Sequence, residues 1–196
     1  MLVYFVRHCP VIRQRTRPVA NWQLALDVTD AERRIGSLMR ALSFEEIVTS
    51  PEQKAIQTSR RLFGNHRLMK TDNRLRELHR SGYVQDYETQ VAAVFSQPSV
   101  SVNRWESAEK CQRRALAALN DFADKGFNRI CICGHGLQGA LLRSFCLRQR
   151  YASLIDWAAI GSPDCMIVRV EPDGDLNLVE DFRGVTHQDT HTAVTG

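Results

Sequence analysis

Two histidines and a serine lie at the ends of short apolar segments in this sequence. His8 and His135 each follow such a segment after one intervening residue, and Ser50 directly follows a third. If the segments are parallel strands, their carboxyl ends meet at one edge of a sheet, where ligands bind in open α/β folds. Arg7 and Lys54 would bring two cations to that edge, beside the amino end of a helix. This set of groups suits a small dianion such as phosphate.

The two imidazoles suit the transfer of a phosphoryl group. An unperturbed histidine titrates at about pH 6.5. A neutral His8 could therefore attack phosphorus, while a charged His135 offsets negative charge on the transferring group. The departing alkoxide would need a proton from a nearby carboxylic acid. Arg7 adjoins an apolar segment, where an unpaired guanidinium is costly, and this favours a bound anion as its partner.

The elements that would position these groups include several short strands. Continuous apolar runs are typical of strands that are covered on both faces of a sheet. The expected strands are Leu2–Val6, Ile47–Thr49, a weaker one near Arg67–Lys70, Arg129–Cys133, and a closing hairpin of Cys165–Val170 and Leu176–Glu180. The hairpin is indicated by the turn residues Pro172-Asp-Gly174 between its strands.

Helical periodicity and capping residues separate these strands. Thr29 and Glu32 have the spacing of a capping box, and Pro51 is expected in the first helical position after Ser50. Further helices are expected near Tyr87–Phe95, after a Ser107 cap, and after Gly134-His-Gly136. The alternation predicts one α/β domain over residues 1–183 with a largely parallel sheet, followed by a flexible tail over residues 184–196.

Composition narrows the classes of protein that fit. The chain has 196 residues, of which 26 are basic and 22 acidic, a mild excess that argues against a dedicated nucleic-acid binder. No apolar run is long enough to cross a membrane, and the apolar N-terminus has no preceding basic region, so a signal peptide is not expected. Six cysteines without framework spacing predict free thiols and a cytoplasmic protein. Oligomeric state is open.

Five short motifs occur in an order that resembles the histidine phosphatase superfamily, the phosphoglycerate mutase-like proteins. The motifs are Arg7-His8-Cys9, Ser50-Pro51-x-x-Lys54-Ala55-x-Gln57-Thr58, Leu75-x-Glu77, Glu106-Ser107 and Gly134-His135-Gly136. The resemblance covers about residues 2–182. It implies a three-layer α/β/α fold with a mostly parallel central sheet and a C-terminal antiparallel hairpin.

The resemblance also implies roles for individual residues. His8 would become transiently phosphorylated, and Glu77 would protonate the leaving group. The residues that bind the phosphoryl group would be Arg7, Gln14, Lys54 and His135, with Arg7 and His135 also catalytic. The implied activity is hydrolysis of a small phosphorylated metabolite or another phosphomonoester, without a metal ion or organic cofactor and without a nucleic-acid or membrane partner. The short interval between Glu77 and His135 resembles the α-ribazole phosphatase-like and broad-specificity phosphatases.

Some positions differ from the family pattern. Cys9 stands where glycine is usual, and Lys54 stands where a second arginine is usual. Lysine keeps the positive charge but lacks the planar, two-pronged grip of a guanidinium on phosphate. These differences leave open a catalytically weak or inactive phosphate-binding member that acts as an interaction or regulatory module. A phosphoglycerate mutase-like phosphotransferase is a further alternative.

Two further groups of side chains could line the site. Arg13, Arg15 and Arg17 lie close together with no acid among them, and they belong either to the anion site or to a solvated loop face. In the family, the segment between Glu77 and His135 supplies substrate specificity. Candidates for the rim of the site within this segment are His79, Arg80, Tyr83, Tyr87 and Trp105.

Two unrelated readings use the same residues. Gly134-x-Gly136-x-x-Gly139 follows a predicted strand and matches a dinucleotide-binding fingerprint, but no strand-ending acid follows at the expected distance of about 20 residues. Cys131 and Cys133 alternate with His135 as metal ligands could, yet no fourth ligand is evident. Cysteines that fill space in a buried strand explain the same pattern.

Overall fold

A computed structural model describes residues 1–64, 68–80 and 82–184 of the chain. Its strands are β1 (Leu2–Arg7), β2 (Glu46–Thr49), β3 (Lys70–Thr71), β4 (Arg129–Gly134), β5 (Asp164–Val170) and β6 (Leu176–Glu180). Its α-helices are α1 (Asp30–Ala41), α2 (Gln53–Phe63), α3 (Tyr87–Ser96), α4 (Ala108–Asp124), α5 (Gly136–Cys146) and α6 (Leu154–Ala159). Two short 3₁₀ helices, η1 (Val19–Asn21) and η2 (Asn73–Leu75), lie in the connections.

The strands of the described chain form one mixed sheet in the order β3-β2-β4-β1-β5-β6. β1, β2, β3 and β4 are parallel, and the hairpin of β5 and β6 adds antiparallel strands beside β1. Arg7 lies opposite Gly134 and Thr49 lies opposite Cys133, so these three strands end at the same edge. The predicted α/β fold and the meeting of the strand ends are confirmed.

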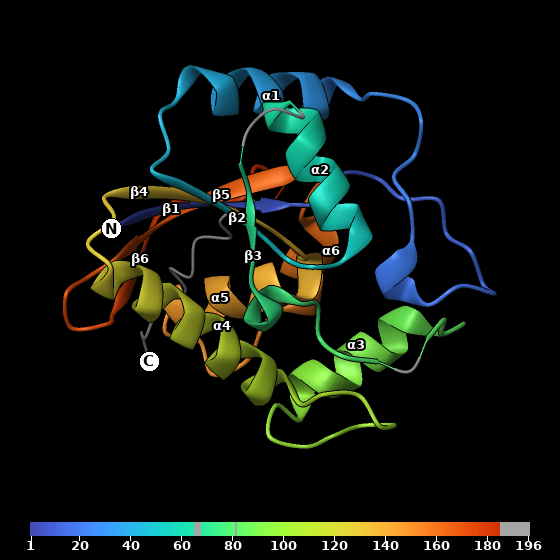
Figure 1. Cartoon of the computed structure of the whole chain (residues 1–196). Coiled ribbons are helices and arrows are strands. Elements are labelled where there is room, and N and C mark those ends of the chain that lie inside the picture. Colours follow the sequence, from blue (N-terminus) through green and yellow to red (C-terminus); the bar gives the residue numbers. More distant parts are fainter. Residues whose placement is uncertain (65–67, 81, 185–196) are drawn as a thin grey trace, which may run out of the picture.

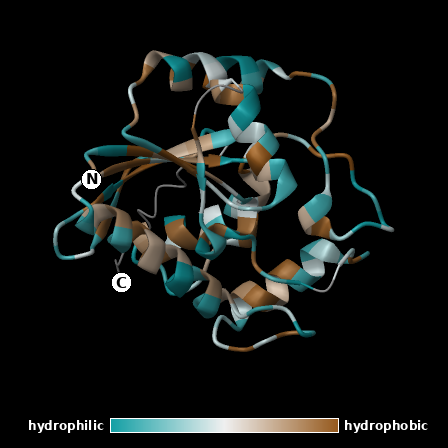
Figure 2. Ribbon diagram, in the orientation of Figure 1, coloured by the Kyte–Doolittle hydropathy of each residue, from teal (hydrophilic) through white to brown (hydrophobic). Residues whose placement is uncertain are grey.

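Helices cover both faces of the sheet and complete three layers (Figure 1). Tyr4 and Val6 of β1 face a cluster with α1 and α2, while Val3 and Phe5 face a larger cluster with α3, α4, α5 and α6. The continuous apolar run of β1 therefore marks a strand buried on both sides. α1 carries both hydrophilic and hydrophobic residues, as expected of a helix with one buried face (Figure 2).

The beginnings of α1 and α2 differ from the prediction. The Thr29 hydroxyl accepts a hydrogen bond from the Glu32 amide at 3.2 Å, but the Glu32 carboxylate pairs with Arg61 at 3.0 Å instead of completing a capping box. α2 begins at Gln53 rather than at Pro51. The reason is a turn in which the Ser50 hydroxyl accepts a hydrogen bond from the Glu52 amide, which makes Glu52 the N-cap residue.

Other differences concern short elements. The weak third strand lies at Lys70–Thr71, later than predicted, and Arg67 lies outside the described residues. η1, η2 and α6 have too few turns for a periodic signal and are not predicted. The expected tail lies outside the described residues from position 185 onward. None of the helices described here is both long and apolar enough to cross a lipid bilayer.

The glycines after β4 serve close packing. A Cβ atom at Gly134 would lie 2.6 Å from the Phe5 ring, and one at Gly139 would lie 3.0 Å from the rings of Phe5 and Phe182. The close approach of the end of β4 and of α5 to Phe5 of β1 therefore explains glycine at these positions without a dinucleotide. Cys131 and Cys133 are likewise buried in the apolar cluster beneath α1 and α2, as space-filling thiols would be.

Candidate active site

A cavity of about 560 Å³ opens beyond the carboxyl ends of β1 and β4. Arg7, His8, Lys54 and Glu77 all line it. His135 is completely buried and does not line this cavity, although its ring lies against that of His8. Four of the predicted site residues therefore share one cavity, and a fifth lies next to it.

Gln14 is not among the residues that line this cavity or its neighbour. Its backbone oxygen accepts a hydrogen bond from the Trp22 indole at 3.0 Å. Its side-chain oxygen is shielded from solvent without a hydrogen-bond partner among the described residues. Binding of a phosphoryl group by Gln14 thus stays a prediction.

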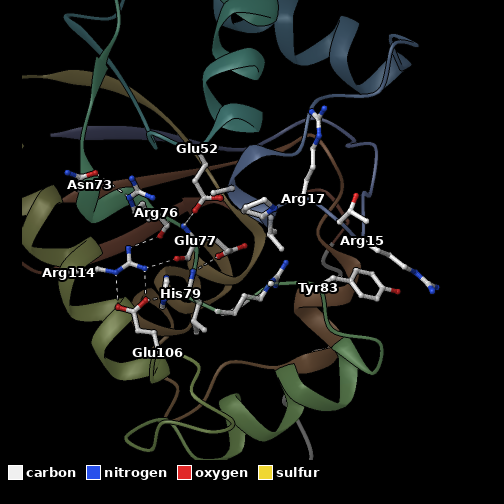
Figure 3. A pocket seen from close by; sticks show the side chains of 17 residues that line it. Arg15, Arg17, Glu52, Asn73, Arg76, Glu77, His79, Tyr83, Glu106 and Arg114 are labelled. Carbon is white, nitrogen blue, oxygen red and sulfur yellow. Dashed lines mark hydrogen bonds and ion pairs between the residues drawn. The ribbon is translucent and has the colours of Figure 1, made fainter.

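A second cavity of about 770 Å³ adjoins the first and shares Val19, Glu77, Arg80 and Tyr83 with it (Figure 3). In Figure 3 the side chains of Arg15 and Arg17 extend away from Glu77. Both arginines are exposed, and the Arg15 guanidinium lies 5.1 Å from the centre of the Tyr83 ring. These two side chains fit the solvated loop face better than the anion site.

His8 is held with one ring nitrogen available for attack. Its Nδ1 atom is 2.8 Å from the backbone oxygen of Cys9. Because a carbonyl oxygen can only accept, Nδ1 carries the proton, and Nε2 of the neutral ring keeps a free lone pair. Burial, reinforced by the nearby His135 ring and the charge of Lys54, lowers the pKa of His8 well below its usual value. The ring is therefore neutral, as a nucleophile requires.

His135 lies 5.5 Å from His8 between ring centres, in an edge-to-face arrangement. Its Nε2 atom is 2.7 Å from the Ser50 hydroxyl, and its Nδ1 atom is buried with no hydrogen-bond partner in the described part of the chain. Burial, and then the charge of Lys54, lowers the pKa of His135 well below its usual value. Without an anion in the site the His135 ring is therefore neutral, and a charged His135 beside a transferring phosphoryl group stays a prediction.

The Arg7 guanidinium is fixed beside His8. Its Nη1 atom donates a hydrogen bond to the Ile160 backbone oxygen, whereas Nε is buried and has no hydrogen-bond partner among the residues described. A Cβ atom at position 136 would lie 2.9 Å from that Nε, so Gly136 is needed for the guanidinium to occupy this place. Arg7 is thus available to an anion in the cavity.

Lys54 has an acidic partner that the sequence prediction overlooked. Its Nζ atom lies 2.6 Å from the Glu52 carboxylate and 3.1 Å from the Val19 backbone oxygen. Both side chains of the pair are buried. The other carboxylate oxygen of Glu52 accepts a hydrogen bond from the Glu77 amide at 2.9 Å and lies 3.8 Å from His135. Glu52 therefore contacts three predicted site residues and neutralises the charge of Lys54.

Glu77 lies at the amino end of α5. Its carboxylate accepts hydrogen bonds from the amides of Leu137 and Gln138, at 3.3 and 3.2 Å, and from the amide of Leu78 at 3.0 Å. These bonds favour the ionised form, but burial, reinforced by the charge of Glu52, outweighs them and raises the pKa of Glu77. A carboxylic acid that keeps its proton at higher pH suits proton donation.

Arg114 of α4 clamps the segment that carries Glu77. It donates hydrogen bonds to the backbone oxygens of Arg76 at 2.7 Å and Glu77 at 3.0 Å, and it pairs with Glu106 at 2.8 Å. Glu106 in turn accepts a hydrogen bond from the His79 amide at 3.0 Å. In Figure 3, Glu52 approaches Glu77 from one side, and this clamp lies on the other. The sequence prediction did not assign Arg114.

Comparisons with known proteins identify a family and a fold. The family model of the histidine phosphatase superfamily (branch 1) matches residues 3–183. No curated protein matches the chain. Among solved structures, Bacillus stearothermophilus YhfR is similar with a TM-score of 0.73 and 20% identity, over 95% of this chain and 98% of that one.

Two further solved structures are similar over most of their length. A mycobacterial glucosyl-3-phosphoglycerate phosphatase has a TM-score of 0.69 and 15% identity, over 91% of this chain and 97% of its own. A phosphoglycerate mutase from Bacillus anthracis has a TM-score of 0.70 and 16% identity, over 92% of each chain. At such identities the structural likeness establishes the fold.

Proposed function

The chain belongs to the histidine phosphatase superfamily, branch 1, and we propose that it hydrolyses phosphomonoesters through a phosphohistidine intermediate on His8. Its family and structural neighbours support a phosphatase or mutase-like activity. The observation that carries the finer proposal is the neutral His8 ring with its free Nε2 atom. His8 lines the same cavity as Arg7, Lys54 and Glu77.

In the first step, Nε2 of His8 attacks phosphorus, and a nitrogen–phosphorus bond forms as the bond from phosphorus to the ester oxygen breaks. Glu77 gives its proton to that oxygen, and the alcohol leaves. In the second step, water attacks the phosphohistidine and Glu77 takes a proton from the water. Inorganic phosphate is released and His8 is restored. Neither step requires a metal ion or an organic cofactor.

Arg7, Lys54 and His135 would hold the phosphoryl group during both steps. The pairing of Lys54 with Glu52 means that Lys54 must exchange a carboxylate for a phosphoryl oxygen when substrate enters. That competition weakens the grip on phosphate relative to a free cation. It is also the observation that favours the second candidate function, a phosphate-binding module with little turnover on the same fold.

Product analysis separates these functions. We expect the protein to release inorganic phosphate from p-nitrophenyl phosphate, and from some members of a panel of phosphorylated metabolites, in step with the free alcohol. Transfer of the phosphoryl group to a second alcohol without release of phosphate would indicate a phosphotransferase. Binding of vanadate without turnover of any panel member would indicate a binding module.

The variant Glu52→Gln is expected to shift the pH dependence of kcat/KM. Activity requires protonated Glu77, so the rate falls as pH rises through the raised pKa of Glu77. Removing the charge of Glu52 removes one cause of the elevation and leaves Lys54 to act on Glu77 unopposed. Both effects lower the pKa of Glu77, so the alkaline limb should move to lower pH.

Steady-state hydrolysis of glycerol 3-phosphate across pH measures this shift, because an alkyl leaving group depends on the proton of Glu77 whereas p-nitrophenolate does not. Glu109→Gln on the exposed side of α4 removes one negative charge from a residue that lines neither cavity, and it should leave the profile of the wild type. An alkaline limb that stays in place in Glu52→Gln, or moves to higher pH, would contradict the assigned influence of Glu52 on Glu77.

A further inference from the structure

Arg80 lines both cavities and has a fixed guanidinium. The guanidinium carbon lies 4.3 Å from the centre of the Tyr87 ring and 5.4 Å from that of Trp105. The Tyr87 ring is itself held edge-on against Trp157 at 5.7 Å. Stacking on aromatic faces orients a guanidinium without neutralising its charge. Arg80 therefore places a positively charged guanidinium group, oriented by aromatic rings, at the cavity.

The donors of Arg80 are incompletely used. Its Nη1 atom is shielded from solvent and has no hydrogen-bond partner in the part of the chain that the structure describes. Two cations near Glu77 differ from Arg80, because Lys54 is paired with Glu52 and Arg114 with Glu106. Arg7 shares the unusual state of Arg80, since its Nε atom is also buried and unpartnered.

The two incompletely satisfied guanidinium groups line the same 560 Å³ cavity, together with His8 and Glu77. A buried donor without a partner is unfavourable, and two guanidinium groups with such donors around one cavity point to an anionic ligand between them. The ligand must be anionic to match two guanidinium charges, and it must be small enough to lie beside His8. A phosphoryl group meets both conditions.

We propose that Arg80 is the second guanidinium of the phosphoryl-binding site, where it donates to a non-bridging oxygen opposite Arg7. This inference rests on the proposed function of the cavity. Position 54 holds a lysine that is paired with Glu52 and has no planar guanidinium. Arg80, three positions after Glu77, supplies the guanidinium instead. Its place next to the proton donor lets Arg80 counter the charge that develops as the ester oxygen departs.

Vanadate, an oxyanion with the shape of a phosphoryl group, serves as the probe because its binding can be measured without turnover. Arg80→Gln is expected to weaken binding of vanadate and inorganic phosphate by about tenfold or more, the usual scale for loss of a charge-assisted hydrogen bond. Arg80→Lys should lie between Arg80→Gln and the wild type. The exposed Arg34 of α1 provides the matched control, and Arg34→Gln should bind vanadate like the wild type.

Unchanged vanadate affinity in both Arg80 variants would overturn the proposal. Hydrolysis of two alkyl phosphates by such a variant would then show what Arg80 does instead. A loss of activity toward 3-phosphoglycerate alone, with glycerol 3-phosphate spared, would place Arg80 at the leaving group, because only 3-phosphoglycerate carries a carboxylate. Thermal unfolding of each variant checks its folding, and Arg80→Lys keeps the charge if Arg80→Gln proves unstable. Arg80-dependent vanadate binding without any turnover would support this inference while refuting the hydrolase.

Discussion

Replacing His8 by alanine should lower kcat/KM for p-nitrophenyl phosphate by on the order of 10³-fold or more, because the reaction then lacks its nucleophile. The remaining cations of the cavity can still bind the phosphate ester, so binding and turnover should separate. The structure supports this expectation through the neutral ring of His8, whose Nδ1 proton is committed to the Cys9 backbone oxygen. Release of p-nitrophenolate measures the loss.

Vanadate binding provides the folding control for His8→Ala, since Arg7 and Lys54 are retained. A variant that binds vanadate and does not hydrolyse the ester behaves as expected. Equal turnover by the wild type and His8→Ala, at any rate above background, would contradict nucleophilic catalysis by His8. It would instead favour a phosphate-binding module in which the residual hydrolysis does not depend on His8.

Replacing Glu77 by glutamine should lower kcat for alkyl phosphates by roughly 10²- to 10⁴-fold, the range of general acid catalysis. The amide is close in shape to the acid, but it has no proton of suitable acidity to give to the leaving oxygen. The kcat for p-nitrophenyl phosphate should fall much less, because p-nitrophenolate leaves without being protonated first. The alkaline limb of the pH profile should also disappear, since Glu77 causes it.

Comparison of glycerol 3-phosphate with p-nitrophenyl phosphate in the same variant tests this role. The exposed Glu109→Gln variant should treat the two esters as the wild type does. Equal losses for alkyl and aryl esters in Glu77→Gln would contradict proton donation. They would instead assign Glu77 a structural role at the amino end of α5, where its carboxylate accepts hydrogen bonds from two backbone amides.

The convergence of the two histidines could be predicted because it follows from topology. β1 and β4 are continuous apolar runs, and their parallel pairing places Arg7 opposite Gly134 at the edge of the sheet where both strands end. Any residue that follows such a strand must emerge at that edge. The same reasoning located the helix that brings Lys54 to the cavity, although α2 starts two residues later than predicted.

The partners of these residues could not be predicted. Glu52 appears in the sequence as an ordinary acidic residue at a helix start. Its pairing with Lys54, two residues later, is local, but its contact with the Glu77 amide arises only when the segments that follow β2 and η2 are brought together. Arg80 is expected only as a candidate for the rim of the site, and nothing in the sequence distinguishes Arg114. Their packing against Tyr87 and their contacts with the backbone near Glu77 depend on tertiary structure.

Detection of a phosphorylated histidine gives the sharpest test of catalysis by His8. Protein mixed rapidly with p-nitrophenyl phosphate, quenched in base and digested can be analysed by mass spectrometry, because phosphohistidine survives base and is lost in acid. We predict a phosphoryl group on His8 that is absent from His8→Ala. Turnover by the wild type with no label on His8, or with the label on another residue, would contradict the proposed intermediate.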